Sequence, residues 1–343
     1  MSRRRHVAFD GSPESDRLLR LLFGPEDELE ARWTAMTPFD VDDLASGLLC
    51  ALPLVQHRLE EAGIADPVLQ RLSGTARKAW YRSQLQLASL EPVVTTLRSA
   101  GLEPLLVGAA VRAAIYYPNP GTRVVPALEA LLEPDRGAKA AAALHADGWR
   151  RAGAVDGAAL RLVGGRDVSL IVHDGLPEGL ASGHDRGGWH ERLRSGARRE
   201  VIGGVEVGVL APVDELILVC AVDARLGDPQ GLQPVLDAQA ILRHAADLAP
   251  DVLARRARAA GAVLAVRGVV ERLAAASAAT SELGRLVDQL ERVRPSVRER
   301  IVHRLALRRL GSPVDRSVAL ARRLRQVEAA VWPRNRSASS RGA

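Results

Sequence analysis

Residues 99–149 read SAGLEPLLVGAAVRAAIYYPNPGTRVVPALEALLEPDRGAKAAAALHADGW, and the fold prediction starts from the order of strands and helices in this stretch. Its hydrophobic residues come in short runs and not at helical spacing, which is typical of buried strands. Between the runs lie small-residue segments with helical composition and one strong Pro/Gly turn signal. In chain order we expect an apolar run, a small-residue helix, the turn, a second apolar run and an Ala-rich helix: 105–107, 109–116, 118–121, 124–132 and 135–147.

The flanks of this stretch differ from each other in hydrophobic period. Upstream, apolar residues recur at three- and four-residue intervals in 14–23 and 40–62, and Gly101 stands where a helix C-cap belongs. Downstream, short runs at 159–163 and 168–172 predict strands. A further hairpin is expected at 201–210, turning at Gly203-Gly204.

Helical period returns after residue 212, with helices expected at 213–225, 232–246 and 252–275. The fold class we predict is α+β, a small mixed-sheet core between helical N- and C-terminal regions. We expect an N-terminal helical region, an α/β core, a C-terminal helical region and a disordered tail: 1–100, 101–212, 213–332 and 333–343.

Composition excludes several classes of protein. Of 343 residues, 47% are hydrophobic and 26% charged, which rules out wholesale disorder, collagen and a disulfide scaffold. Cys50 and Cys220 lie far apart on apolar segments, so we interpret both as buried free thiols in a reducing cytoplasm. The longest uncharged stretch near the start, 44–56, is shorter than the ~18–20 apolar residues of a membrane span. We expect a cytoplasmic protein without a membrane partner.

Charge is distributed unevenly along the chain. Lys78 and Lys139 are the only lysines among 47 basic residues, for which a high-GC bacterial genome is the simple explanation. From Asp251 to the end the chain carries 20 arginines and 8 acidic residues, so that the first 250 residues are net acidic. This basic C-terminal region is a candidate site for a nucleic acid or an acidic protein partner, or consists of solvated helix faces.

A family resemblance follows from the quoted stretch. A helix ending in Gly, a strand L-L-V-G-A-A, a turn Y-x-N-P-G-x-R and a helix running to A-D-G-W resemble the bacterial uncharacterised nucleotidyltransferases, a branch of the DNA polymerase β-like superfamily. Upstream PFDVDDLASGLLCALPLVQHRL and downstream LAPVDELILVCAVDA and LQPVLDAQAIL resemble the family's flanking helices. The resemblance covers roughly residues 15–275.

The resemblance implies metal-assisted chemistry. Two carboxylates at alternate positions of one strand share a face, a third comes from a neighbouring strand, and together they hold two Mg²⁺ ions on the triphosphate. Here the paired positions fall on Ala127 and Glu129, and the third falls on Ser169. Asp167, two residues earlier, is the candidate replacement. The candidate catalytic and metal-binding residues are therefore Glu129 and Asp167.

Two further positions match the family pattern. Gly108 stands at the strand–helix turn where backbone approaches phosphate, and Arg123 ends the turn motif. The resemblance makes them candidate nucleotide-binding residues, although close packing and turn capping explain them equally. The family's Lys is Val107, and Pro126 replaces the Gly before the carboxylate pair. Asp237 aligns with an Asp of the family's C-terminal helix and serves either the site or a helix contact.

Weaker constellations remain outside this resemblance. His184, Asp185 and His190 are expected in a Gly-rich loop, GHDRGGWHER. The two histidines with the intervening Asp could bind Zn²⁺, but no third partner has the spacing of a known site. His173-Asp174 ends a predicted strand and could supply acid and base, without a nucleophile motif nearby. No Walker A loop is present.

Two functions compete. One is a nucleotidyltransferase-fold protein that has lost catalysis and acts in binding or scaffolding, with no cofactor and a nucleotide or protein as candidate partner. The alternative is an active Mg²⁺-dependent nucleotidyltransferase acting on a small molecule or protein. The altered carboxylate positions favour the first.

Overall fold

The computed structural model describes residues 13–36, 44, 46–154, 159–177, 186–223, 231–245 and 248–301. The described chain begins with helices that run to residue 99. Amphipathic spacing places their leucines inward: Leu18, Leu22, Leu52 and Leu59 are almost fully buried. The helices are α1 (Pro13–Phe23), α2 (Leu29–Thr34), α3 (Leu52–Glu61), α4 (Val68–Ala88) and α5 (Leu90–Ser99).

The described residues of the middle region build a seven-stranded mixed sheet in the order β3-β4-β5-β2-β1-β7-β6. β1 lies antiparallel to β2 and parallel to β7, and β2 lies parallel to β5. The strands are β1 (Leu105–Val107), β2 (Leu128–Leu132), β3 (Arg150–Ala154), β4 (Ala159–Val163), β5 (Ser169–Asp174), β6 (Arg198–Ile202) and β7 (Val205–Val209). Helices α6 (Ala109–Ile115), α7 (Gly137–Ala146) and α8 (Arg186–Ser195) lie between them.

The two faces of the sheet pack against different helices. Strand residues of one parity, such as Leu128, Ala130 and Leu170, form one core with the apolar residues of α5 and α7. Residues of the other parity, such as Leu105 and Leu131, join a second core that includes α8 and the C-terminal helices. Alternation of side chains along a strand produces this division. The second face is the one that carries Glu129.

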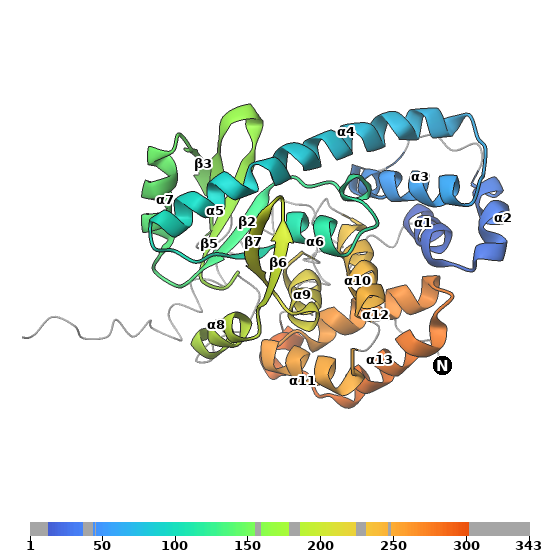
Figure 1. The fold of residues 1–343 in the computed structure, drawn as a ribbon. Helices are drawn as coiled ribbons and strands as arrows, with labels where there is room; N and C mark the ends of the chain where they lie inside the picture. The colour runs from blue at the N-terminus through green and yellow to red at the C-terminus, as the bar shows by residue number, and fades with distance from the viewer. Residues whose placement is uncertain are drawn as a thin grey trace, which may run out of the picture.

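The C-terminal helices complete the fold (Figure 1). The single helix predicted for 252–275 is wrong, because the chain breaks at Gly261 in the left-handed conformation with φ +67°. Glycine adopts this conformation without the Cβ penalty of other residues and ends α11. The helices are α9 (Pro212–Leu218), α10 (Gln233–His244), α11 (Pro250–Ala260), α12 (Val263–Ala276) and α13 (Thr280–Arg292).

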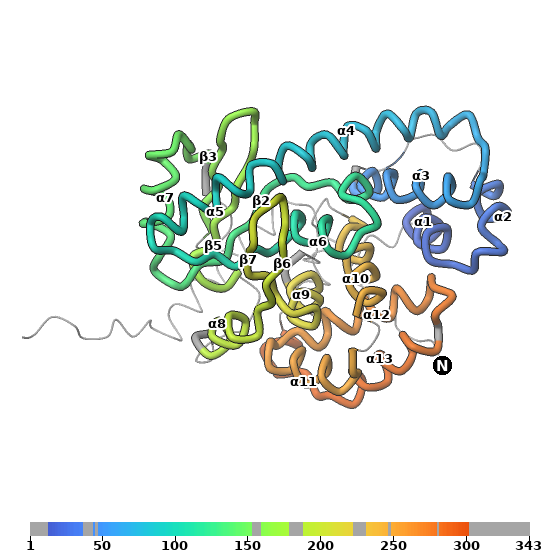
Figure 2. Tube along the Cα trace, in the orientation of Figure 1, coloured from blue at the N-terminus to red at the C-terminus, as the bar shows by residue number. Residues whose placement is uncertain are grey.

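The first described helix packs against the C-terminal helices. In the tube of Figure 2, α1 (blue) and α12 (orange) approach one another, and the two helices are in contact. The Ala278 amide donates to the Phe23 carbonyl at 3.0 Å, and Arg272 lies 3.6 Å from Asp16. The N-terminal and C-terminal helical regions therefore share one core.

The predicted fold class is confirmed: an α+β sheet core lies between helical regions, and all described strands fall between residues 105 and 209. The Gly203-Gly204 hairpin forms as expected, with Ile202 opposite Val205. β3 was not expected, because a short edge strand rich in arginine lacks apolar alternation. The predicted tail at 333–343 lies outside the described residues.

Three further expectations meet the structure here. Cys50 and Cys220 form no disulfide within the described residues, and Cys220 is buried while Cys50 is partly so. No helix in the described ranges has the length and apolar character to cross a membrane. Some of the described C-terminal arginines form ion pairs with carboxylates of the protein. Four of those described pair with carboxylates of Asp251, Asp214, Glu271 and Asp16, respectively: Arg255, Arg256, Arg267 and Arg272.

Candidate functional site

Strand β2 presents the predicted carboxylate position to the second face of the sheet. Alternation places Ala127, Glu129 and Leu131 on this face, while Leu128 and Ala130 enter the opposite core. The parallel pairing sets Glu129 opposite Ile171 and Leu131 opposite His173 on β5. His173 is thus the diagonal neighbour of Glu129 on the same face.

Glu129 and His173 form a pair. His173 Nε2 lies 3.1 Å from Glu129 Oε2, with 11% of the histidine side chain and 25% of the glutamate side chain exposed. A carboxylate only accepts hydrogen bonds, so the pairing requires a proton on Nε2. Burial opposes ionisation of Glu129, but the hydrogen bond from His173 and the nearby positive charges, including Arg112 and Arg123, outweigh it and lower the pKa of Glu129.

Gly108 closes the other side of the Glu129 carboxylate. Its φ of +81° with ψ −157° belongs to a region that only glycine adopts readily. A Cβ added there would overlap Glu129 Oε1. The resemblance assigned Gly108 to a phosphate, whereas the structure places a carboxylate against it. Glu129 is therefore held between Gly108 of the β1–α6 turn and His173 of β5.

Arg123 lies in a buried ion pair. Its Nη2 is 2.8 Å from Asp237 Oδ2 and its Nε is 3.1 Å from Asp237 Oδ1. The arginine is 4% exposed and the aspartate 1%. Asp237 of α10 thus neutralises the positive charge of Arg123 inside the protein. Of the two roles considered for Asp237, the site or a helix contact, this contact is the one that the structure shows.

Asp237 is the centre of a larger polar cluster. Arg112 donates to it at 2.9 Å, Tyr117 at 2.7 Å and Gln233 at 2.8 Å, and Arg112 also pairs with Glu215 at 2.7 Å. Burial raises the pKa of Asp237, but the two arginines and their hydrogen bonds outweigh it and hold that pKa far below its usual range. We call Arg112, Tyr117, Arg123, Glu215, Gln233 and Asp237 the Asp237 cluster. It joins α6 and the following turn to α9 and α10.

The other predicted metal positions do not complete a metal site. Ala127 has no donor atom, and Ser169 offers a hydroxyl. Asp167 is exposed in the turn before β5, with φ +57°, beyond the register that pairs Glu129 with Ile171. Within the described ranges no group of three or more His, Cys, Asp or Glu side chains could hold a metal ion. The residues present do not fit the pair of Mg²⁺ ions that the resemblance implies.

Only one residue of the zinc hypothesis lies within the described part of the chain. His184 and Asp185 lie outside the described residues. His190 lies within helix α8 and not in a Gly-rich loop, because Trp189 and Leu193 are buried in the core there, and burial overrides the poor helix propensity of glycine. His190 Nε2 lies 2.9 Å from the Leu132 carbonyl, which fixes the ring.

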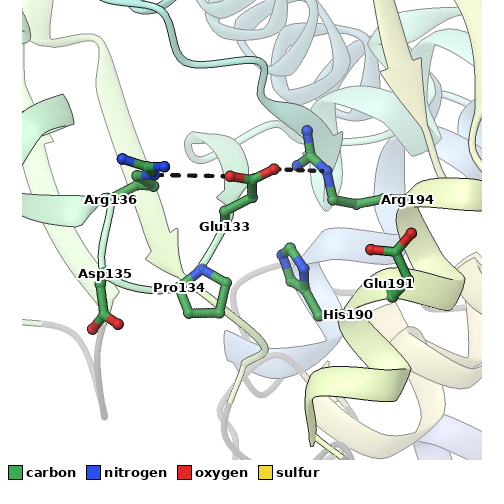
Figure 3. Close-up of a pocket in the computed structure, with 7 residues that line it drawn as sticks. All are labelled: Glu133, Pro134, Asp135, Arg136, His190, Glu191 and Arg194. Atoms are coloured by element: carbon green, nitrogen blue, oxygen red, sulfur yellow. Dashed lines mark ion pairs between the residues drawn. The ribbon is translucent and has the colours of Figure 1, made fainter. Parts of the chain in front are cut away.

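An open pocket of about 460 Å³ lies at the other end of β2, past Leu132 (Figure 3). Glu133 stands between two arginines, with Arg136 at 3.8 Å and Arg194 at 3.7 Å. His190, of the weaker zinc hypothesis, lines this pocket, but none of the four residues predicted from the family resemblance does: Gly108, Arg123, Glu129 and Asp167. We therefore place the candidate site at the Glu129 pair and not here.

The seven-stranded sheet, the turn at Gly108 and the strand that carries Glu129 form the α+β core of a nucleotidyltransferase-like domain, which the following match identifies. The sequence profile of the uncharacterised nucleotidyltransferases matches residues 51–276, about two thirds of the chain. The chain belongs to this family. A comparison with curated proteins found no match.

Sequence reasoning missed the role of His173. It noted His173 only beside Asp174, at the end of a strand. The missing information was the parallel register of β2 and β5, which brings residues 44 positions apart into contact. Asp174 instead accepts from the Arg136 amide at 2.9 Å.

Proposed function

We propose that this protein is a catalytically degenerate nucleotidyltransferase that acts by binding a partner and not by transferring nucleotides. One observation carries the proposal. On the face where the family's metal-binding carboxylates belong, the side chain of Ala127 has no metal-binding atom and Glu129 is paired with His173. Two-metal catalysis stabilises the attacking and the leaving oxygen together, so it needs both metals in place.

The hydrogen bond to His173 bears directly on metal affinity. A divalent cation at Glu129 would have to displace His173 from Oε2 or share that oxygen with it. Gly108 packs closely against the other oxygen, Oε1. Removing one preorganised electrostatic contact typically costs a factor of ~10²–10³ in rate. Because the effects of residues that act as a unit are non-additive, the costs at the altered positions are not multiplied, and we expect turnover to fall by at least the factor for one absent ligand.

Nucleotide binding through Gly108 and Arg123 is a separate part of this proposal. Both residues face a carboxylate of the protein itself, Gly108 that of Glu129 and Arg123 that of Asp237. We therefore expect weak nucleotide binding at most, and we expect it without a requirement for Mg²⁺.

The test is incubation with labelled nucleoside triphosphates, Mg²⁺ or Mn²⁺ and candidate acceptors, beside Glu129→Ala. We expect no transfer above background in either protein. Mn²⁺ binding, followed by the loss of the free-ion signal in electron paramagnetic resonance, should also be equal in both proteins. Robust transfer that disappears in Glu129→Ala would instead establish the active enzyme with Glu129 as a ligand.

A further inference from the structure

Helix α4 carries an unusual charge pattern for its length. Its 21 residues include Arg71, Arg77, Lys78 and Arg82 and no acidic residue. All four basic residues are exposed. In Figure 1 the helix runs along the outside of the molecule, from the N-terminal helices to the sheet. It therefore offers a positive surface outside the basic C-terminal region.

The same helix carries the exposed aromatic rings. The chain has few aromatics, and six of the eight in the described residues are less than 9% exposed: Phe23, Trp33, Tyr116, Tyr117, Trp149 and Trp189. The other two are Trp80, 48% exposed, and Tyr81, 58% exposed. They are adjacent and lie among the basic residues. Exposing a large ring forgoes the free energy of its burial, so two neighbouring exposed rings mark a contact surface.

Helical spacing gathers these side chains. Tyr81 lies three and four residues after Lys78 and Arg77, and Trp80 lies three after Arg77, so that each ring neighbours a cation on the helix surface. We call Arg77, Lys78, Trp80, Tyr81 and Arg82 the α4 basic–aromatic surface.

The inner side of α4 fixes this surface in place. Trp80 packs its ring edge on Gly121, where an added Cβ would lie 2.9 Å from Trp80 Cδ1. Ser83 donates to the Arg123 carbonyl at 3.2 Å. The rings are thus presented by a helix docked on the turn that leads into β2, and little order has to be gained on binding.

The cations of the surface have no acidic partners among the described residues. Arg77, Lys78 and Arg82 form no ion pair there, whereas exposed arginines elsewhere do, such as Arg199 with Glu103 at 3.1 Å. Charges without internal partners are available to neutralise the charges of a ligand.

We propose that the α4 basic–aromatic surface binds single-stranded nucleic acid. Cations supply phosphate contacts and exposed rings supply stacking for unpaired bases, the combination that single-strand binding uses. A duplex hides its bases from such stacking. A lipid surface requires aliphatic residues to insert, but Leu72 and Leu87 of α4 point into the protein. An acidic peptide would use the cations and leave the rings without partners.

This inference does not rest on the loss of catalysis. Its residues lie on α4, and none lies on β2 or β5. Transfer assays and strand-binding assays therefore succeed or fail separately.

The experiment measures fluorescence anisotropy of labelled 20-nucleotide single-stranded RNA and DNA with the full chain, at several salt concentrations. Three proteins are compared with the wild type: Tyr81→Ala, the triple variant Arg77→Gln/Lys78→Gln/Arg82→Gln, and a matched control, Arg150→Gln/Arg151→Gln/Arg161→Gln. The control removes the same charge from exposed arginines of β3 and β4. Circular dichroism verifies that each variant is folded.

We expect binding of single strands in the wild type, about tenfold weaker binding in Tyr81→Ala and a larger loss in the α4 triple variant. The slope of log affinity against log salt should fall by about 2 in that variant. The control should bind within about twofold of the wild type.

Three results would overturn the inference. The first is no binding of single strands. The second is an equal loss in the control, which would indicate non-specific charge attraction. The third is equal binding in Tyr81→Ala, or a preference for duplex, anionic vesicles or an acidic peptide, since the rings would then have no role.

Discussion

Asp237 and Glu129 are two carboxylates near the same face of the sheet, and they differ in how completely the protein satisfies them. Asp237 accepts five hydrogen bonds, from Arg112, Tyr117, Arg123 and Gln233, and is 1% exposed. Glu129 pairs with one histidine, and a quarter of its side chain is exposed. A carboxylate has about four lone-pair sites, so Asp237 has no capacity left while Glu129 does.

This difference separates a structural role for Asp237 from a chemical role for Glu129. Both residues align with acidic or altered positions of the family, yet only Glu129 keeps access to solvent. Asp237 balances the buried charge of Arg123 and Arg112, together with Glu215. We therefore assign the Asp237 cluster to stability and the Glu129 pair to any remaining site chemistry.

Breaking the Asp237 cluster should have the largest effect. Asp237→Asn leaves two buried guanidinium groups with one carboxylate between them, and unpaired buried charge costs about 3–5 kcal/mol. Urea denaturation of the variant should show a loss of that size, whereas Asp251→Asn, which removes an exposed ion pair, should change the free energy of unfolding far less. A loss below about 1 kcal/mol for Asp237→Asn would mean that the Asp237 cluster does not have the stabilising role assigned to it.

The same cluster should make folding stability sensitive to acid. The pKa of Asp237 is lower in the folded than in the unfolded protein, where an Asp titrates near about 3.9. Its contribution to stability is therefore complete above that value and is lost as the pH falls toward the folded-state pKa. Urea midpoints measured from pH 6 to pH 3 should decline more steeply in the wild type than in Asp237→Asn. Parallel slopes would contradict this assignment.

Gly108→Ala should have the next largest effect. The backbone conformation of Gly108 strains any other residue, and the new methyl group meets Glu129. We expect a loss of about 1–3 kcal/mol in the free energy of unfolding. In the double variant with Glu129→Ala, the part of this loss that comes from the steric clash should disappear, and the part that comes from backbone strain should remain. No recovery in the double variant would show that the carboxylate does not pack against Gly108.

The Glu129–His173 pair should couple more weakly than the buried cluster. A double-mutant cycle with Glu129→Ala and His173→Ala should give an interaction energy of about 1 kcal/mol, since the pair is partly exposed and joined by one hydrogen bond. Denaturation of the four proteins measures it. Simple additivity would mean that the two side chains do not interact in solution.

The smallest effect should come from Glu103, whose ion pairs are more exposed than the Glu129–His173 pair. Glu103 accepts from Arg98 at 2.8 and 3.0 Å and from Arg199 at 3.1 Å, and the hydrogen bond from Arg98 is the main cause of its lowered pKa. Glu103→Gln should cost only about 0.2–1 kcal/mol, with the difference shrinking in 1 M salt. A cost as large as that of Asp237→Asn would mean that burial does not govern these pairs.

Local sequence signals predicted much of the fold, and tertiary contacts produced the rest. Apolar runs located β1 and β5, and Gly203-Gly204 located the hairpin, because strand burial and turn conformation depend on residues that are neighbours in sequence. Gly261 divided a predicted helix, and buried Trp189 made a helix of a Gly-rich segment. The break at Gly261 is a local backbone effect, whereas the helix at Trp189 depends on a core assembled from distant residues.

The candidate site was predicted only in part for the same reason. Strand alternation was enough to place Ala127 and Glu129 on one face. The partners of Glu129 and Arg123 were not predictable, because His173 and Asp237 come from 44 and 114 residues further along the chain. Their meeting requires the sheet register and the packing of α10, which no spacing within either motif encodes.

The contact of α1 with α12 has a consequence for the order of synthesis. Ser15 and Arg272, which share a buried hydrogen bond, are 257 residues apart. At about 5–20 residues per second, a ribosome delivers Arg272 roughly 13–50 seconds after Ser15. During that interval Leu18, Leu21 and Leu22 of the nascent chain lack the C-terminal helix that covers them. A chaperone that holds apolar segments on the ribosome would therefore find α1 without its C-terminal partner helix throughout that interval.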